Sequence, residues 1–266
     1  MLRRQIGWLV AQMYAVSGRR AAVCRRVRRE RLVVPVLFHG PSPEFLDGLL
    51  AGLDRFVGLE NVEITFDDGR KAAMECVPVL EKYGVPAVFF ISPGEILRGY
   101  NWAECVAEAG VGDFAALCRM SADERWAAFD AVGWSCNRTS NLMSVEDVRA
   151  LANHRLVEFG NHTWSHLSCV NRPLEEVLVE IDRAQAQIAE WTGRAPSKFS
   201  YPFGHDTPEL DAAVRARGLV PYSLRPGLST RRCDGRFRNM AYENMTFAEN
   251  IGRLLMAWPG VRRMPS

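Results

Sequence analysis

Short apolar runs of strand length recur along the chain, and segments with helical spacing separate them. Residues 32–38 and 86–92 are near-continuous apolar runs, as strands buried on both faces require. Between them, residues 62–66 alternate apolar and polar side chains. One helix is predicted to begin at residue 43, after the run at 32–38. A second is predicted over about 71–83, after the segment 62–66, and Gly84 is its stop. This strand–helix–strand order predicts a parallel α/β sheet or barrel.

The same alternation continues in the second half of the chain. A long helix is predicted from Pro173 to Gly193, with Pro173 in its first turn and the glycine as its stop. A further helix is expected over 208–217. The other strands expected here cover residues 156–160, 198–201, 219–224 and, more weakly, 237–241, and a last helix covers 246–257.

Residues from about 93 to 143 break the alternation. Their pattern is helical, with candidate helices at 102–109, 113–120 and 121–132, the last opened by a capping box at Ser121 and Glu124. We expect this segment to be an insertion that covers the mouth of the domain. Another helix is expected to start at Ser144 and to end near Asn153.

The formal net charge of +2 is unevenly distributed. Residues 1–31 hold nine arginines and one glutamate, which gives +8 and leaves −6 for residues 32–266. The chain is therefore divided into a basic N-terminal segment, 1–31, and one larger domain, 32–266. Residues 2–16 are predicted to form an amphipathic helix, which either meets anionic lipid or packs on the domain with solvated arginines. A basic N-terminal segment on an acidic domain indicates that residues 1–31 attach the protein to a surface. It argues against a nucleic-acid partner.

The seven cysteines form no C-x-x-C pair and most lie among apolar neighbours. They are interpreted as small core residues, and unpatterned free thiols favour a reducing compartment. The apolar stretch 6–16 is too short to span a bilayer and lacks a convincing cleavage site. The expectation is a cytoplasmic protein, with peripheral attachment to the inner membrane face as an option.

Candidate chemistry begins where the strand at 62–66 ends, on Asp67, Asp68 and Gly69. Alone, an Asp-Gly pair is more often a turn than a site. Farther along, His162 and His166 are four residues apart, which on one helical turn places both imidazoles on one face. Two histidines and Asp68 would form a metal site with open positions, for zinc by default or for iron, cobalt or nickel. The alternative is two ordinary polar residues at a helix start.

If Asp68 binds the metal, Asp67 is free to act as general base on a water made acidic by the ion. A backbone N–H from the turn at residues 201–204 could share the developing oxyanion, because its glycine allows close approach. The competing interpretation of Y-P-F-G is a simple β-turn.

Three short motifs resemble a known family. T-F-D-D-G at 65–69, H-T-W-S-H at 162–166 and S-Y-P-F-G at 200–204 are similar, in order, to the first three motifs of the polysaccharide deacetylases, the NodB-homology group or carbohydrate esterase family 4. The resemblance implies a distorted (β/α) barrel and metal-dependent removal of N- or O-linked acetyl groups from sugars. It also implies these roles: Asp67 as base; Asp68, His162 and His166 on the metal; Tyr201, Pro202 and Phe203 on the substrate, with the Phe203 amide as oxyanion donor.

Three departures from the family pattern stand out. Ser200 occupies the place of an arginine that orients the base in many members. The tryptophan-bearing fourth motif is not evident after Leu219. The fifth motif, Leu-x-His, is absent because no histidine follows His205, and the usual general acid is therefore missing.

His39 is our candidate for that acid. V-P-V-L-F-H-G at 34–40 resembles the N-terminal Tyr-His strand end of the poly-N-acetylglucosamine deacetylase branch, whose barrel elements are permuted. A strand-end histidine can point into the mouth of a barrel, and its pKa suits protonation of a leaving amine. The alternative is an exposed loop histidine. His205 is the second candidate for the acid, and His154 is interpreted as a capping or surface residue.

The sequence therefore predicts a metal-dependent deacetylase of an N-acetylated sugar, in the biosynthesis of a surface glycan or glycolipid. Its partners would be that glycan and, through residues 1–31, an anionic membrane surface. Hydrolysis of a cyclic amide or ureide is an alternative within enzymes. A glycan-binding module without catalysis is the alternative from another class, suggested by the missing arginine and late histidine.

Overall fold

The computed structural model describes residues 19–134, 141–230 and 235–255. The helix expected over 2–16 lies outside these residues, as do Cys136 and Cys233. The other five cysteines are buried or half-buried, and no disulfide joins them to one another. None of the described helices is long and apolar enough to cross a bilayer.

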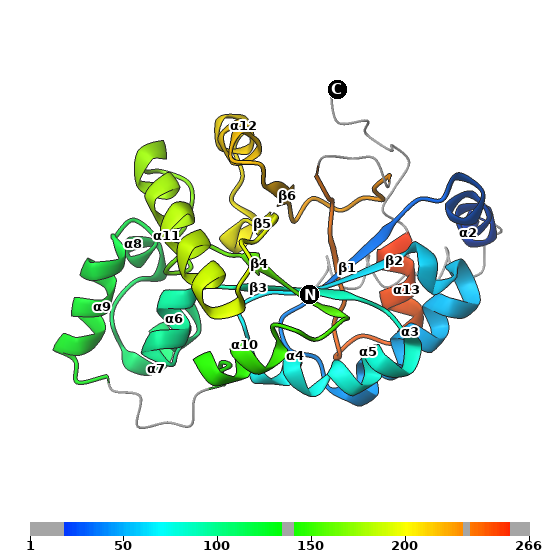
Figure 1. Ribbon diagram of the computed structural model, residues 1–266, viewed down its shortest axis with the longest axis horizontal. Helices are drawn as coiled ribbons and strands as arrows, with labels where there is room; N and C mark the ends of the chain where they lie inside the picture. Colours follow the sequence, from blue (N-terminus) through cyan, green and yellow to red (C-terminus); the bar gives the residue numbers. More distant parts are fainter. Residues whose placement is uncertain (1–18, 135–140, 231–234, 256–266) are drawn as a thin grey trace.

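A seven-stranded parallel sheet forms the centre of the described chain, in the order β6-β5-β4-β3-β2-β1-β7. It curls into a distorted barrel, with helices around its outer face (Figure 1). This confirms the predicted parallel α/β barrel. The strands are β1 (Val34–Phe38), β2 (Val62–Phe66), β3 (Ala87–Ile91), β4 (Val157–Asn161), β5 (Lys198–Ser200), β6 (Val220–Tyr222) and β7 (Asn239–Met240).

Alternation along the strands separates an apolar outer layer from a polar interior. In β2, Ile64 and Phe66 pack in the main core with the leucines of α3 (Pro43–Val57). Glu63 and Thr65 point the other way, where Thr65 donates a hydrogen bond to the Val36 carbonyl. Because side chains alternate in a strand, Asp67 continues this interior row at the carboxyl end.

The gap between the outermost strands, β6 and β7, is bridged just before β7 begins. Tyr222 of β6 forms a parallel bridge with Arg236, and β7 then pairs with β1 through Val36 and Asn239. The segment 236–240 therefore passes from one edge of the sheet to the other. Arg238 lies in the middle of this crossing, fully buried.

The single helix predicted over 71–83 is wrong, because the structure has two helices there, α4 (Lys71–Glu75) and α5 (Val77–Tyr83). Pro78 explains the break, because proline cannot donate to a carbonyl one turn back and its ring clashes there. Gly84 ends α5 in the left-handed conformation, as predicted (φ 65°). The remaining helices outside the insertion are α2 (Arg19–Glu30), α10 (Val145–Leu151), α11 (Leu174–Thr192), α12 (Pro208–Ala216) and α13 (Phe247–Leu255).

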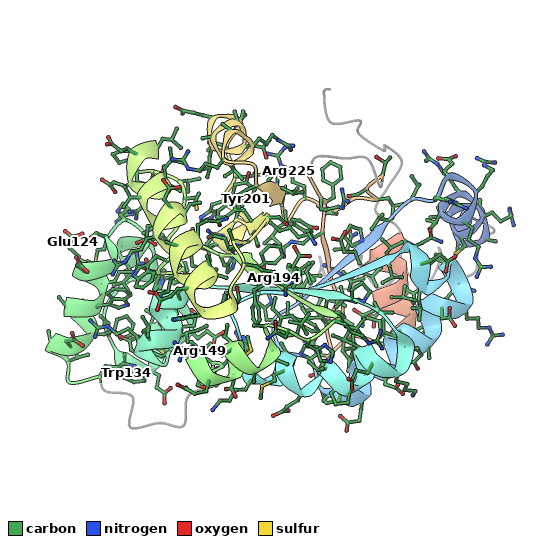
Figure 2. All side chains as sticks on the ribbon, in the orientation of Figure 1. Glu124, Trp134, Arg149, Arg194, Tyr201 and Arg225 are labelled. Atoms are coloured by element: carbon green, nitrogen blue, oxygen red, sulfur yellow. The ribbon has the colours of Figure 1, made fainter. Side chains whose placement is uncertain are left out.

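The insertion after β3 is helical, as predicted, and its four helices lie together on the side of the barrel away from α2 (Figure 1). Trp102, Val106 and Phe129 belong to its own small core. The capping box at Ser121 and Glu124 is present, and Glu124 lies at the outer edge of the molecule (Figure 2). The helices are α6 (Pro93–Arg98), α7 (Trp102–Ala109), α8 (Phe114–Leu117) and α9 (Ala122–Ala131), of which α6 was not expected, because Pro-Gly is typical of a turn.

Candidate active site

Two adjacent carboxylates follow β2 and line the same cavity. Asp67 and Asp68 are 3% and 6% exposed. Side chains of adjacent strand residues normally point apart. Asp68 and Gly69 both adopt positive φ, 72° and 68°, and this left-handed turn brings the second carboxylate to the same side. An aspartate held in this conformation is strained, and such strain is concentrated at functional sites.

The two histidines lie in a loop directly after β4 and not on a helical turn, so that part of the prediction was wrong. Thr163 and His166 have positive φ, 63° and 50°, which no helix would contain. Side-chain hydrogen bonds hold the loop: Thr163 N–H donates to Asn161 Oδ1, and Leu167 N–H donates to Thr163 Oγ1. The loop nevertheless brings the imidazoles together, with their centroids 4.9 Å apart.

Side chains of the insertion and of α11 hold the histidine loop in place by hydrogen bonds. Arg125, fully buried in α9, donates to both the carbonyl and the hydroxyl of Ser165. Glu180 in α11 accepts from the backbone N–H and the hydroxyl of the same serine. Trp102 Nε1 donates to the His166 carbonyl at 3.1 Å. The insertion therefore fixes the histidine loop as well as covering the domain.

Asp68, His162 and His166 form a buried cluster whose ligand atoms all lie within 4.8 Å of one another. Asp68 Oδ1 lies 3.5 Å from His162 Nε2 and 3.2 Å from His166 Nε2. Ligand atoms about 2.1 Å from a tetrahedral zinc ion would be about 3.4 Å apart, so the spacing fits a metal. Asp68 Oδ1 is also buried without a hydrogen bond from the described chain, as expected for an atom that binds an ion.

The His162 ring is oriented for this use. Its Nδ1 lies 2.8 Å from the Ser200 carbonyl, which can only accept, so Nδ1 carries the proton. Nε2 is then the unprotonated nitrogen that faces Asp68. Burial raises the pKa of Asp68, but without an ion the two imidazoles in their protonated form would donate to its carboxylate, outweigh burial and hold the pKa well below its ordinary value.

Asp67 is held by an arginine that the sequence analysis missed. Arg238 donates from Nη1 to Oδ1 at 2.6 Å and from Nη2 to Oδ2 at 2.9 Å, the bidentate geometry of a strong pair. Ser200 Oγ accepts from Arg238 and donates to Asp67 Oδ2 at 3.1 Å. Burial raises the pKa of Asp67, but the Arg238 guanidinium, together with charge on His162 and His39, outweighs burial, so the pKa lies below its usual value.

Arg238 and Ser200 thus supply the contact that the expected motif arginine would make. Ser200 carries no charge, so the cation beside the base is the guanidinium of Arg238, which comes from the crossing segment 236–240. The available signal was an arginine in the middle of the weak apolar run at 237–241. A charged residue in a buried segment needs a partner, but the sequence does not indicate which carboxylate supplies it.

Of the histidines proposed as general acid, His39 reaches the cavity. It follows β1, lines the cavity and places Nε2 3.9 Å from Asp68 Oδ2, with its side chain 39% exposed. His205 does not line the cavity, and its Nδ1 lies 2.9 Å from Ser168 Oγ. Burial lowers the pKa of His205. His154 lies after α10 and contacts Glu81, a surface role as expected.

Of the three turn residues predicted to contact the substrate, Tyr201 and Phe203 line the cavity and Pro202 does not. Tyr201 is buried and donates its hydroxyl to Asp211, so its polar end points away from the cavity. Pro202 is buried and does not line the cavity. Phe203 lies against His166, with ring centroids 4.6 Å apart, and has φ 59°. Phe203 therefore lies beside the metal-ligand cluster, whereas Tyr201 lines the cavity with its hydroxyl turned to Asp211.

The cavity at these strand ends has a volume of about 390 Å3. Leu224 lies on one side, and residues of the insertion form the opposite wall. Arg70 lies 3.6 Å from Asp68 Oδ2 and also pairs with Glu104 of α7. The insertion therefore contributes side chains to the cavity: Asn101, Ala103, Glu104 and Phe114.

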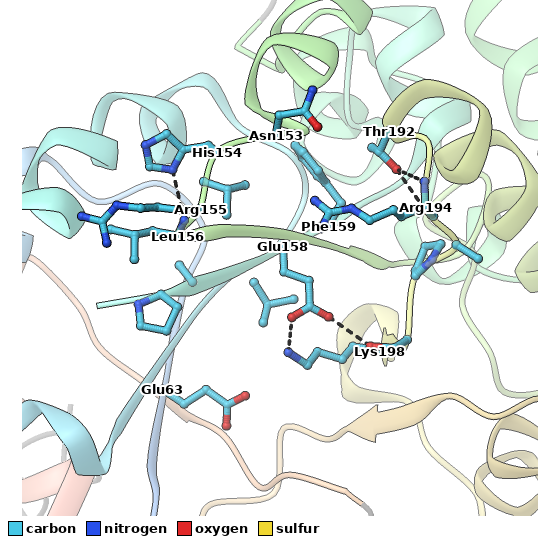
Figure 3. Close-up of a pocket in the computed structure, with 17 residues that line it drawn as sticks. Glu63, Asn153, His154, Arg155, Leu156, Glu158, Phe159, Thr192, Arg194 and Lys198 are labelled. Atoms are coloured by element: carbon cyan, nitrogen blue, oxygen red, sulfur yellow. Dashed lines mark hydrogen bonds and ion pairs between the residues drawn. The ribbon is translucent and has the colours of Figure 1, made fainter. Parts of the chain in front are cut away.

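A larger pocket, about 470 Å3, lies at the opposite, amino-terminal end of β3, β4 and β5 (Figure 3). Its charged groups are paired within the protein: Glu158 with Lys198, and Glu63 with Arg236. The described residues that line it include no group of three metal ligands. In parallel barrels the chemistry belongs to the carboxyl ends, so this pocket is not the candidate active site.

The fold and the cluster together describe a parallel α/β barrel with a candidate metal site at the carboxyl ends of its strands. The family model for polysaccharide deacetylases matches residues 58–222, and the chain belongs to that family. His39 and Arg238 lie on either side of the matched segment. No curated protein matched the chain.

Several solved structures share this fold. IcaB from Ammonifex degensii is 19% identical, with 92% of this chain and 89% of that chain covered and a TM-score of 0.52. BC0361, a polysaccharide deacetylase from Bacillus cereus, is 13% identical over 84% of this chain and 69% of its own (TM-score 0.57). The deacetylase PplD from Streptococcus pyogenes, solved with acetate, is 14% identical over 84% and 98% (TM-score 0.55). At these identities the likeness concerns the fold.

Proposed function

We propose that the protein is a metal-dependent hydrolase that removes the acetyl group from an N-acetylated sugar. The observation that carries the proposal is the buried Asp68–His162–His166 cluster with a second, arginine-held carboxylate, Asp67, beside it. Membership of the polysaccharide deacetylase family supports the substrate class. The names of two structural neighbours, a deacetylase and a polysaccharide deacetylase, agree with it.

Asp68, His162 and His166 would hold the ion, for which zinc is our first choice and iron, cobalt or nickel are compatible with the same ligands. Such an ion polarises the substrate carbonyl and makes nearby water more acidic. The pairing with Arg238 keeps Asp67 ionised, so it can accept a proton as water adds to the acetyl carbon. The Phe203 amide is our candidate donor to the developing oxyanion.

The C–N bond then breaks, and the leaving nitrogen needs a proton. His39 is placed to donate it, because it reaches the cavity on the side of Asp68 and remains partly exposed to water. The products are acetate and a free amino sugar. Each carboxylate and histidine at the strand ends has one task in this scheme: holding the ion, accepting a proton or donating one.

The direct test is acetate release from N-acetylglucosamine oligomers by the zinc-loaded protein. Asp67→Asn should abolish release, a loss of at least about 1,000-fold, and still bind one equivalent of metal, because the base is not a ligand. Asp130→Asn, on the surface of the insertion, is the matched control and should retain full activity. Full activity of Asp67→Asn would contradict the assignment of the base.

The same assay separates the alternatives. Ring-opening of cyclic amides without acetate release would indicate the other C–N hydrolase. Tight sugar binding with no turnover would indicate a non-catalytic module. The missing motif arginine and the missing late histidine suggested a non-catalytic module. Against that alternative, Arg238 holds Asp67 and His39 reaches the cavity.

We further propose a cytoplasmic location at a membrane face, in the biosynthesis of a surface glycan or glycolipid. The support is α2, which buries Cys24 and Val27 in the main core and exposes Arg25, Arg28 and Arg29. Nitrogen-tipped side chains project from the outside of this helix (Figure 2). Lipid-facing arginines contribute about 1 kcal/mol each.

Arg25→Gln with Arg29→Gln should therefore weaken sedimentation with anionic vesicles by about tenfold or more, and acetate release should not change. The comparison with zwitterionic vesicles is the control. If the full-length protein fails to sediment with anionic vesicles, the tether is wrong and the enzymatic proposal is unaffected.

A further inference from the structure

Aromatic rings pack together between the Asp68–His162–His166 cluster and the surface of the insertion. Phe203 packs on His166, with ring centroids 4.6 Å apart. Phe114 of α8 then meets Phe203 edge to face, at 5.6 Å and 89°. Phe114 also stacks on Trp102, at 5.5 Å and 22°, and the centroids of Trp102 and Phe203 are 5.8 Å apart, so the three rings form one cluster. Trp102 is fully buried, but Phe114 is 41% exposed and lines the candidate active-site cavity.

The position of Phe114 is fixed by its neighbours. Asp113 caps α8 by accepting from the Ala116 N–H. Trp102, on which the ring stacks, donates to the His166 carbonyl and lies under the Arg125 guanidinium, 4.8 Å from the ring centroid. The exposed ring is therefore preorganised, and a ligand would not have to order it.

Polar groups lie beside this ring. Glu104 and Arg70 form an ion pair at the same cavity, with side chains 31% and 25% exposed. A rigid aromatic surface flanked by a few polar groups is the usual composition of a small-molecule site. A pyranose ring matches it, because a sugar has an apolar C–H face and a rim of hydroxyl groups.

We propose that Phe114 is the platform on which the sugar ring of the substrate lies, with Glu104 and Arg70 beside its hydroxyl groups. The proposal rests on the proposed function, since it places the acetamide group at Asp68, His162 and His166. It assigns to the insertion a direct part in substrate recognition. Phe114 touches the sugar ring and not the reacting atoms, so it determines binding and specificity.

Phe114→Ala should raise the KM for an N-acetylglucosamine oligomer about tenfold, with kcat changed by less than about twofold. The reason is that a platform that holds the ground state and the transition state equally well contributes uniform binding. Hydrolysis of ethyl acetate, which has no ring, should not change. Phe114→Trp should restore the low KM.

Phe247→Ala is the matched control. Phe247 is also a phenylalanine, 42% exposed, and stacks on another ring, Phe56, at 24°, but it lies on α13 and does not line the cavity. This variant should leave both KM and kcat unchanged. An unchanged KM for Phe114→Ala, or an equal increase for Phe247→Ala, would overturn the platform.

A binding measurement makes the test independent of turnover. In the Asp67→Asn background, calorimetry with the same oligomer should show about tenfold weaker binding when Phe114→Ala is added. Equal affinities would reject the platform even in an active enzyme. Absence of acetate release from the wild type, together with this weaker binding, would reject the proposed reaction and retain the platform.

Discussion

The two ends of the same barrel each contain a pocket with acids, bases and a histidine, yet they are chemically different. The pocket at the amino-terminal end is the larger one, about 470 Å3 against about 390 Å3. At that end Glu158 pairs with Lys198, and Glu63 with Arg236 and with the Tyr222 hydroxyl. At the carboxyl end, Asp68 Oδ1 is buried without a hydrogen bond from the described chain and faces two imidazole nitrogens.

The difference teaches that charge pairing identifies a site better than volume does. At the amino-terminal end each oxygen of Glu63 and of Glu158 has a partner within the protein, so neither carboxylate has an oxygen left without a partner to bind an ion. A buried ligand atom that lacks a hydrogen-bond donor destabilises the fold unless an ion or a substrate binds to it. The backbone agrees with this distinction, because Asp68, Thr163, His166 and Phe203 all have positive φ and all lie near the carboxyl ends.

The largest expected effect comes from removing a ligand at the carboxyl end. His166→Asn should weaken metal binding by at least about 100-fold and abolish acetate release. Asparagine tolerates the left-handed backbone at this position, so the fold should persist. Calorimetric zinc titration measures the loss, and His154→Asn, outside the cavity, should bind zinc like the wild type.

The next effect concerns proton donation. His39→Asn should lower kcat by about 100-fold for sugar amides, as removal of a general acid does, and should leave metal content unchanged. His205→Asn is the matched control, because this histidine contacts Ser168 and does not line the cavity. If His205→Asn slows the reaction and His39→Asn does not, the assignment of the acid must be exchanged.

A smaller effect, with a pH signature, is expected for the arginine that holds the base. Arg238→Met should reduce kcat/KM by about 10- to 100-fold, as loss of an orienting partner does. Removing the cation destabilises ionised Asp67, so its pKa rises and the acid limb of the kcat/KM profile moves to higher pH.

Arg236→Met serves as the control for this shift. It removes another arginine of the same crossing segment, which pairs with Glu63 at the other end of the barrel. It should lower stability without moving the acid limb. A profile that stays in place in Arg238→Met would show that the arginine does not set the ionisation of Asp67.

The smallest effect belongs to the amino-terminal pocket. Glu158→Gln should change the free energy of unfolding by less than about 1 kcal/mol, because partly exposed ion pairs contribute little. Acetate release should stay within about twofold of the wild type. Thermal unfolding measures the change in stability, and the acetate assay measures the change in activity. A large loss of activity would show that the amino-terminal pocket takes part in the reaction, contrary to this prediction.

Much of the fold followed from periodicity. The strands appear near their predicted positions, and the capping box and the glycine stops are where the sequence places them, because these signals are local. The helix predicted over 71–83 is interrupted before Pro78, because a proline inside a helical pattern breaks it.

The sequence predicted the three residues of the candidate metal cluster, Asp68, His162 and His166, but not the loop that holds the histidines. Four-residue spacing suggested a helical turn for His162 and His166, whereas side-chain hydrogen bonds and two positive φ angles form a loop that brings the rings together. Arg238 could not be connected to Asp67 from spacing, since 171 residues separate them and only the closure of the barrel brings them together. Long-range partners of this kind depend on the sheet order, which local patterns do not contain.

The central claim is that the carboxyl-end cluster is a metal-dependent deacetylase site. Its most direct test is acetate release from an N-acetylglucosamine oligomer by protein stripped with a chelator and then given one equivalent of zinc. We predict that stripping abolishes release and that zinc restores it in the wild type, while Asp67→Asn takes up the same zinc and remains inactive. Undiminished release by the metal-free wild type would contradict the claim.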